Sequence, residues 1–152
     1  MKLVGYAGPC LVGMLNLTIP SAATAEPLVD QFVKSCIETL PDFARLDETL
    51  QSTDFHTTSE NQWGRDSDTA VFLLEEETDR LICMVGVIGD HVASMSTSLE
   101  EVLAEGKLGR YEEKSYQRRK LYLLKTQNGL TILEVIPPLG ATTFLVANAQ
   151  KE

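Results

Sequence analysis

The first regular pattern of apolar residues in the chain lies in residues 27–40. Apolar side chains recur there every three or four positions, at Leu28, Val29, Phe32, Val33, Cys36, Ile37 and Leu40. This spacing places them on one side of an α-helix and polar residues on the other. Pro27 suits the first helical position, which needs no N–H donor, and Pro41 disfavours continuation of the helix. The pattern predicts a helix over 27–40 with Cys36 on its buried side.

Two shorter helices are predicted further along the chain. Asp42 can cap the first of them. The inward positions of that helix are Phe43, Leu46 and Leu50. Ser98 and Glu101 form a capping box for the second helix, which ends at Gly106. Residues 51–69 are polar apart from Phe55 and Trp63, so we expect a loop there that is either functional or mobile.

Strand-like runs of apolar residues fill the remainder of the chain. Residues 71–74 and 81–88 flank the acidic turn 75–79, residues 119–126 and 130–136 flank Asn128-Gly129, and residues 142–149 form a last strand. The predicted order is therefore ααββαβββ. Helices separated from runs of hairpin-connected strands are typical of an α+β fold. We expect one domain over 26–152, with an antiparallel sheet of about five strands and helices packed on one face.

Residues 1–25 have the form of an export signal. One cation, Lys2, precedes an apolar stretch, and the segment ends in small residues in which Ala23 and Ala25 form an A-x-A cleavage motif. We expect cleavage before Glu26. Glycine, proline and asparagine interrupt the apolar run, which a membrane-spanning helix would need to keep for about 20 residues. The protein is therefore expected in the periplasm, with its signal peptide removed and no stable membrane anchor afterwards.

Composition and charge limit the classes of partner. The chain has 152 residues, of which 43% are hydrophobic and 23% are charged, as in ordinary folded soluble domains. Lys and Arg number 13 against 22 Asp and Glu, which gives a formal net charge of -9. Such a charge repels nucleic acid and anionic lipid headgroups. The basic run Arg118-Arg119-Lys120 is then interpreted as the charged side of a strand, and no nucleic-acid partner is expected.

Two of the three cysteines are expected to pair. Cys10 leaves with the signal peptide, whereas Cys36 lies on a buried helix stripe and Cys83 lies in an apolar strand. Both side chains should therefore face the same core, and two buried thiols in an oxidising compartment usually form a disulfide. The alternative is two inert core thiols.

No constellation of residues indicates a reaction. Asp90, His91 and Ser94 have the side chains of a hydrolase triad, but adjacent residues point in different directions and no G-x-S-x-G turn is present. A turn and a helix cap explain these residues better. His56 and His91 lack the spacing of a zinc site, and the acidic turn lacks the alternation of a calcium loop. We therefore predict no catalytic residue, no metal and no cofactor.

Part of the chain resembles a group of exported bacterial proteins. The order is an export signal, a helix with a central Cys, Leu40-Pro41-Asp42-Phe43, a polar loop and a Cys-bearing strand at 81–85. Over residues 26–90 this order resembles small periplasmic proteins of alphaproteobacterial type that have no assigned function. The resemblance implies a periplasmic location and a Cys36–Cys83 pair, and it implies no catalytic residue.

The strongest local signal is the hairpin around Asn128-Gly129, because these residues tolerate the positive φ angles of a tight turn. With this turn, Thr126 pairs with Thr131 and Tyr122 with Val135. One face then carries Tyr122, Leu124, Leu133 and Val135 and is the predicted core. The opposite face carries Leu121, Leu123, Ile132 and Ile136, beside only Lys125 and Glu134, and is more apolar than a solvated sheet face. We expect a protein partner or a second copy, as a homodimer, to cover it.

These observations favour an exported envelope protein without catalytic activity that binds another protein or a peptide. Two other classes stay open. One is a small-ligand carrier with a pocket between sheet and helices. The other is an enzyme, either a periplasmic hydrolase that uses His91 or a thiol enzyme that uses Cys36.

Overall fold

The computed structural model describes residues 25–65, 70–117, 119–126 and 129–150 of the chain. These residues form one antiparallel sheet of eight strands in the order β1-β2-β3-β4-β8-β7-β6-β5. The strands are β1 (His56–Ser59), β2 (Gln62–Gly64), β3 (Ala70–Glu76), β4 (Arg80–Ile88), β5 (Arg110–Tyr116), β6 (Arg119–Thr126), β7 (Gly129–Leu139) and β8 (Thr142–Gln150). The helices are α1 (Ala25–Phe32), η2 (Val33–Ile37), α2 (Leu46–Gln51) and α3 (Val92–Ala104). The antiparallel α+β class is confirmed, and the expected strand count was too low.

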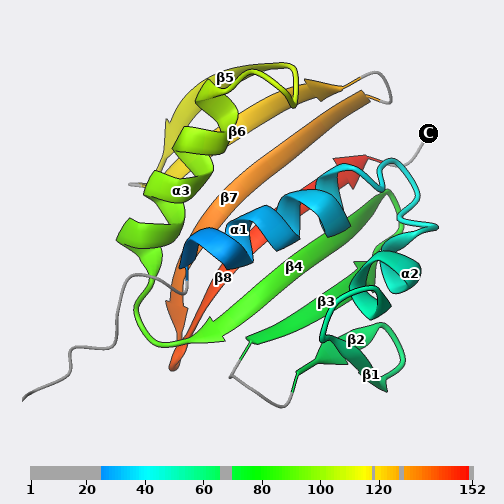
Figure 1. The fold of residues 1–152 in the computed structure, drawn as a ribbon. Coiled ribbons are helices and arrows are strands. Elements are labelled where there is room, and N and C mark those ends of the chain that lie inside the picture. The colour runs from blue at the N-terminus through cyan, green and yellow to red at the C-terminus, as the bar shows by residue number, and fades with distance from the viewer. Residues whose placement is uncertain (1–24, 66–69, 118, 127–128, 151–152) are drawn as a thin grey trace, which may run out of the picture.

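The long helices cover one face of the sheet. Figure 1 shows α1 and α3 in front of the same side of the sheet, with α1 over the central strands, α3 over β5 to β7 and α2 nearer to β1 and β2. The core lies between these helices and the sheet. Phe32 from α1 and Met95 from α3 are fully buried there, as are Val85 and Leu145 from the two central strands.

A helix followed by a four-stranded meander occurs twice in the described chain. Strands β1 to β4 follow the first helices, and β5 to β8 follow α3. The last strand of each half meets the other at the centre of the sheet, where Cys83 of β4 lies opposite Ala147 of β8. No repeat is visible in the sequence, because a shared topology requires only similar burial patterns and not similar residues.

The strands that the sequence pattern did not predict lie at the two ends of the sheet. β1 and β2 occupy part of the segment expected to be a loop, and β5 lies between two predicted elements. Every residue of β1 and of β5 is exposed. These outer strands are held by backbone pairing to their neighbours, so they need no alternation of apolar residues.

The first predicted helix ends earlier and changes type. It is α-helical to Phe32 and continues as the π-helical segment η2, in which the N–H of Glu38 donates to the carbonyl of Val33. The widened turn keeps Cys36 and Ile37 buried. The apolar stripe therefore predicted the buried side correctly but not the final turn, because α-helical and π-helical turns place side chains similarly over so few residues.

The two shorter helices begin at different residues from those predicted. The Asp42 carboxylate accepts a hydrogen bond from the N–H of Ala44 in a turn, and α2 begins only at Leu46. The predicted inward residues Phe43, Leu46 and Leu50 are nevertheless buried. α3 begins at Val92, so Ser98 lies inside the helix and its capping box does not form. Met95, four residues before Leu99, extends the buried stripe of α3 towards its N-terminus.

The hairpin of β6 and β7 has a register two residues away from the predicted one. Thr126 pairs with Gly129, and Tyr122 pairs with Leu133 rather than Val135. The connection is therefore made by residues 127–128, which lie outside the described residues, as does Asn128 of the predicted turn. A shift of two keeps every side chain on its predicted face. Tyr122, Leu124, Leu133 and Val135 are all buried in the core.

The signal-peptide prediction concerns residues mostly outside the described part of the chain. Lys2, Cys10 and Ala23 belong to residues 1–24, and α1 begins at Ala25, one residue before the predicted new N-terminus. Among the described helices, none combines the length and the apolar character needed to cross a membrane.

Candidate functional site

The side of the sheet opposite α1 and α3 carries a large share of apolar residues. We call it the helix-free face, because no described helix lies over it (Figure 1). Successive residues of a strand point to opposite faces. Cys83, Val85, Leu145 and Leu133 point into the core, so their neighbours along the strands point to the helix-free face.

The four residues predicted to form a partner surface lie together on this face. Leu123 of β6 is directly opposite Ile132 of β7, and Leu121 is directly opposite Glu134. Ile136 is directly opposite Phe144 of β8. Leu121, Leu123, Ile132 and Ile136 are all half-buried. Their partner has not been tested, so that role stays a prediction.

The sequence pattern did not identify a second group of apolar residues that adjoins these four. It consists of Ile82, Met84, Phe144 and Val146 from β4 and β8. Val146 is only 4% exposed although no described helix covers it, because its neighbours on the face surround it. The alternation in β8 signals that one side is apolar, but only its pairing with both β4 and β7 brings the two groups together.

Two adjoining hollows follow the central strands of this face. The larger has a volume of about 320 Å³ and lies among Met84, Phe144, Ile136 and Leu139. The smaller has about 200 Å³ and lies beside Leu130 and Ile132. Arg80 and Asn148 line both hollows, so the two form one groove. Leu139, at one end of this groove, is 68% exposed.

Gly86 makes room for the Phe144 ring, which lines the larger hollow. A Cβ atom on Gly86 would lie 2.7 Å from the ring of Phe144, which is its direct partner on β8. The absence of a side chain at Gly86 therefore lets the Phe144 ring approach the backbone of β4 closely. The ring and Met84 both line the larger hollow.

One carboxylate lies in the middle of the apolar positions. Glu134 is 9% exposed and lies between Leu121 of β6 and Val146 of β8. Its Oε1 is 2.7 Å from a guanidinium nitrogen of Arg119. This ion pair compensates the buried charge.

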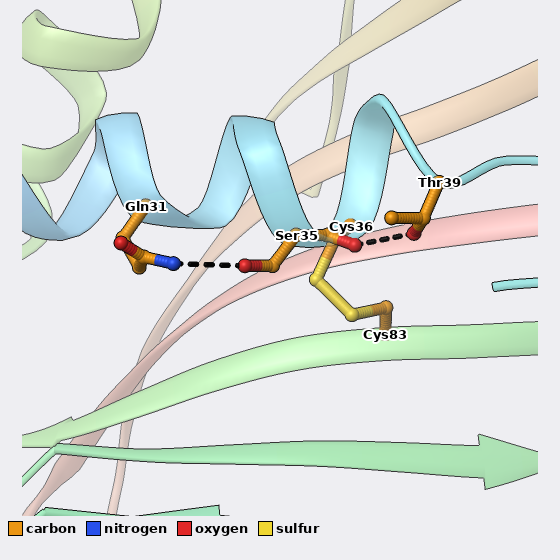
Figure 2. The surroundings of a disulfide bond; sticks show 5 residues. All are labelled: Gln31, Ser35, Cys36, Thr39 and Cys83. Carbon is orange, nitrogen blue, oxygen red and sulfur yellow. Dashed lines mark hydrogen bonds between the residues drawn. A yellow bond between two sulfur atoms is a disulfide. The ribbon is translucent and has the colours of Figure 1, made fainter. Parts of the chain in front are cut away.

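The disulfide connects the helical layer to the centre of the sheet. Cys36 of η2 and Cys83 of β4 are bonded, with Cα atoms 5.7 Å apart, and neither is exposed. Figure 2 shows the bond below the helix and the hydrogen bond that Gln31 donates to the Ser35 hydroxyl. The Thr39 hydroxyl donates to the Ser35 carbonyl one turn later. The predicted cysteine pair is confirmed, and it fixes the helix end to the strand.

A polar cluster joins α3 to the outer strands on the core side. The Tyr122 hydroxyl and the Lys120 ammonium donate to the same oxygen of Glu100, at 2.7 and 2.6 Å. Burial, followed by the bond to Glu100, raises the pKa of Tyr122 above its usual range. The bonds from Lys120 and Tyr122 lower the pKa of Glu100. The three side chains are hydrogen-bonded within the cluster, which holds α3 on the sheet.

Asp90, His91 and Ser94 do not form a hydrogen-bonded triad. The Ser94 hydroxyl donates to the His91 carbonyl, and the Asp90 carboxylate accepts from the N–H of Val92. The His91 ring contacts the carbonyl of Ile88 at 3.1 Å. These bonds belong to a turn and to the start of α3, as the sequence predicted. Whether the protein has activity stays untested.

His56 lies on the exposed edge strand β1, whereas His91 directly precedes α3. In the described part of the chain, no three His, Cys, Asp or Glu side chains gather as a metal site would require. Between α3 and the sheet there is a hollow of about 230 Å³ beside Val92 and Tyr122. Pockets for small ligands usually measure about 300 to 1,000 Å³.

Comparison of the chain with models of protein families, with curated proteins and with solved structures gave no match. The resemblance to exported alphaproteobacterial proteins therefore stays an expectation.

Proposed function

We propose that this protein is an exported, non-catalytic binding protein of the bacterial envelope, and that it binds another protein or a peptide through the helix-free face. The observation that carries the proposal is the groove over β4, β8 and β7, whose sides are apolar and which no described element covers. Contiguous apolar surface of this kind on a folded domain marks interaction sites.

Three features support a binding role over the other classes. Two adjoining hollows, of about 320 and 200 Å³, form one groove on the helix-free face. On the helical side, the hollow between α3 and the sheet measures about 230 Å³ and the one between the first helices and α3 about 290 Å³, both below the usual range of ligand pockets. The side chains of the one triad-like cluster are engaged with the backbone. A buried disulfide is typical of proteins that fold in an oxidising compartment, which agrees with the expected periplasmic location.

The test is a charge placed in the groove. Ile132→Asp puts a carboxylate on the floor of the smaller hollow, and Ala93→Asp puts the same group on an exposed position of α3 as a control. Purified parent and variants, each checked for folding by urea unfolding, are used to capture partners from an envelope extract of the native cells. We expect a discrete partner with the parent and with Ala93→Asp, and its loss with Ile132→Asp.

Equal capture by all three proteins would remove the helix-free face from the proposal. If Ile132→Asp fails to fold, Leu123→Asp on the neighbouring strand repeats the test at a half-buried position. Turnover of ester, peptide or glycoside substrates that is lost in His91→Ala would contradict the non-catalytic assignment.

A further inference from the structure

We infer that the partner of the helix-free face is a protein segment in which apolar residues are followed by acidic ones, and that its acidic end lies over Arg110 and Lys125. This inference rests on the proposed function and adds the chemistry of the partner.

The first observation is an uncompensated pair of cations. Arg110 of β5 and Lys125 of β6 are directly opposite each other in the sheet, and both are exposed. Like charges at directly opposite positions destabilise a pair of strands. Neither side chain forms an ion pair with a residue that the structure describes, whereas Lys114 and Arg119 on the same face contact Glu112 and Glu134. An anion from outside would relieve the repulsion.

The cation pair adjoins the apolar groove. Lys125 is directly opposite Leu130, which lines the smaller hollow and is 39% exposed. Leu123, two residues before Lys125, is on the same face at a distance of about 7 Å along the strand. A ligand that lies on Leu123 and Ile132 therefore reaches both cations with a group one or two residues further along.

The charge of this part of the face differs in sign from that of the chain. On β5, β6 and β7, its described basic residues are Arg110, Lys114, Arg119 and Lys125, and its acidic residues are Glu112 and Glu134. Asp79 and Arg80, which line the smaller hollow, add one charge of each sign. The chain as a whole carries a net charge of -9. A basic surface attracts anionic partners, and the acidic remainder of the molecule repels them. Such partners therefore bind preferentially at this face.

A polar group in the groove favours a polypeptide over a fatty acyl chain. The Asn148 amide lines both hollows. A polypeptide can form hydrogen bonds with this amide through its backbone, whereas an acyl chain would bury it without a partner. A second copy is also a poor fit, since facing copies would each bring the same excess of cations.

The experiment uses a random library of displayed peptides of about 15 residues, which can reach about 50 Å when extended. The library is selected on the purified protein, and enriched peptides are synthesised and titrated by fluorescence anisotropy. We expect enriched peptides with apolar residues next to Asp or Glu. The double variant Arg110→Glu/Lys125→Glu should bind them about tenfold or more weakly. The matched control is Lys34→Glu/Arg45→Glu, which makes the same charge change at exposed positions on the helical side and should bind normally.

Charge exchange gives the decisive comparison. A peptide in which Lys replaces the acidic residues should lose binding to the parent and regain it with Arg110→Glu/Lys125→Glu. Enriched peptides without acidic residues, or equal binding to that variant, would overturn the inference and leave the proposed function standing.

Three further outcomes would contradict the inference, and the first two would assign the face to another occupant. A parent of dimeric mass in light scattering that becomes monomeric in Ile132→Asp would assign the face to a second copy and overturn the inference. Displacement of the peptides by dodecanoate at lower concentration than the peptides themselves require would assign it to a fatty acid. No peptide sensitive to Ile132→Asp would overturn both this inference and the proposed function.

Discussion

At the scale of single residues, the fold depends on polar groups that meet specific partners from distant parts of the chain. The indole N–H of Trp63 donates to Asp47 at 2.6 Å, and Gln51 donates to the other oxygen of the same carboxylate. This joins α2 to the short strand β2. The Tyr122 hydroxyl bonded to Glu100 plays a similar part between β6 and α3.

Replacing Asp47 by Ala should destabilise the protein by about 1 to 3 kcal/mol. Trp63 is 5% exposed, so its N–H would be left buried without an acceptor. The free energy of unfolding from urea titration measures the change, and Glu48→Ala at the adjacent exposed position is the control. Equal stability of the two variants would show that the Trp63 bond contributes nothing.

Tyr122 should make the protein sensitive to alkali. The ordinary pKa of tyrosine is 10.0, and burial raises the pKa of Tyr122 in the folded state. The folded protein therefore keeps a proton that the unfolded chain releases, so the free energy of unfolding falls as pH rises above about 10. Urea titrations between about pH 8 and about pH 11 measure how steeply the free energy of unfolding falls with pH. The fall should be smaller in Tyr122→Phe. An unchanged slope in that variant would refute the prediction.

At the scale of elements, each strand of the central sheet separates two environments. Leu133 is completely buried in the core, and its neighbour Ile132 is half-buried on the helix-free face. The disulfide connects these central strands to the end of the first helix. Side-chain alternation and one covalent bond therefore define the two layers.

Truncation of adjacent residues in β7 should have unequal effects. Leu133→Ala leaves a cavity in the core and should cost about 2 to 5 kcal/mol. Ile132→Ala removes a side chain that is already in contact with water and should cost clearly less. Urea unfolding of both variants tests this difference. A larger loss for Ile132→Ala would mean that the helix-free face is the better-packed side.

Reduction of the disulfide should lower the free energy of unfolding by about 4 kcal/mol. The bond joins residues 47 positions apart in the chain and so restricts the unfolded state. The melting temperature with and without a reductant measures the effect. The Cys36→Ala/Cys83→Ala variant is the control, since its melting temperature should not respond to the reductant. A parent whose unfolding is equally unaffected would contradict the expected contribution of the bond.

At the scale of the whole molecule, helices lie against one face of the sheet and no described helix lies against the other. A helix followed by a four-stranded meander occurs twice in the described chain. The two central strands, β4 and β8, contribute to both the core and the groove. Binding at the groove would therefore be supported by the most buried part of the fold.

The exported protein should begin at Glu26. We expect the A-x-A motif at Ala23 and Ala25 to direct cleavage there, which would leave all of α1 except its first residue. The intact mass of protein from the periplasmic fraction measures the new N-terminus. A full-length chain that fractionates with membranes would contradict both the cleavage and the location.

Several features of this protein were determined by local sequence alone. The stripe from Leu28 to Ile37, the core side of β6 and β7, and the strands β3 and β4 follow from spacings of two to four residues, which any helix or strand converts into a face. Cys36 and Cys83 could be paired in the same way, since both lie on such faces. The four predicted partner residues shared a face for the same reason, even though the register was wrong by two.

Only the tertiary structure decided which faces became neighbours. The exposed strands β1 and β5 form because a paired strand lies beside them, which no local pattern encodes. The groove exists because β8 lies between β4 and β7, so that Phe144 and Val146 meet residues far away in sequence. The cation pair of Arg110 and Lys125 likewise depends on the pairing of β5 with β6. Pairing between distant strands is set by the packing of the whole chain, and therefore the composition of the groove could not be derived from periodicity.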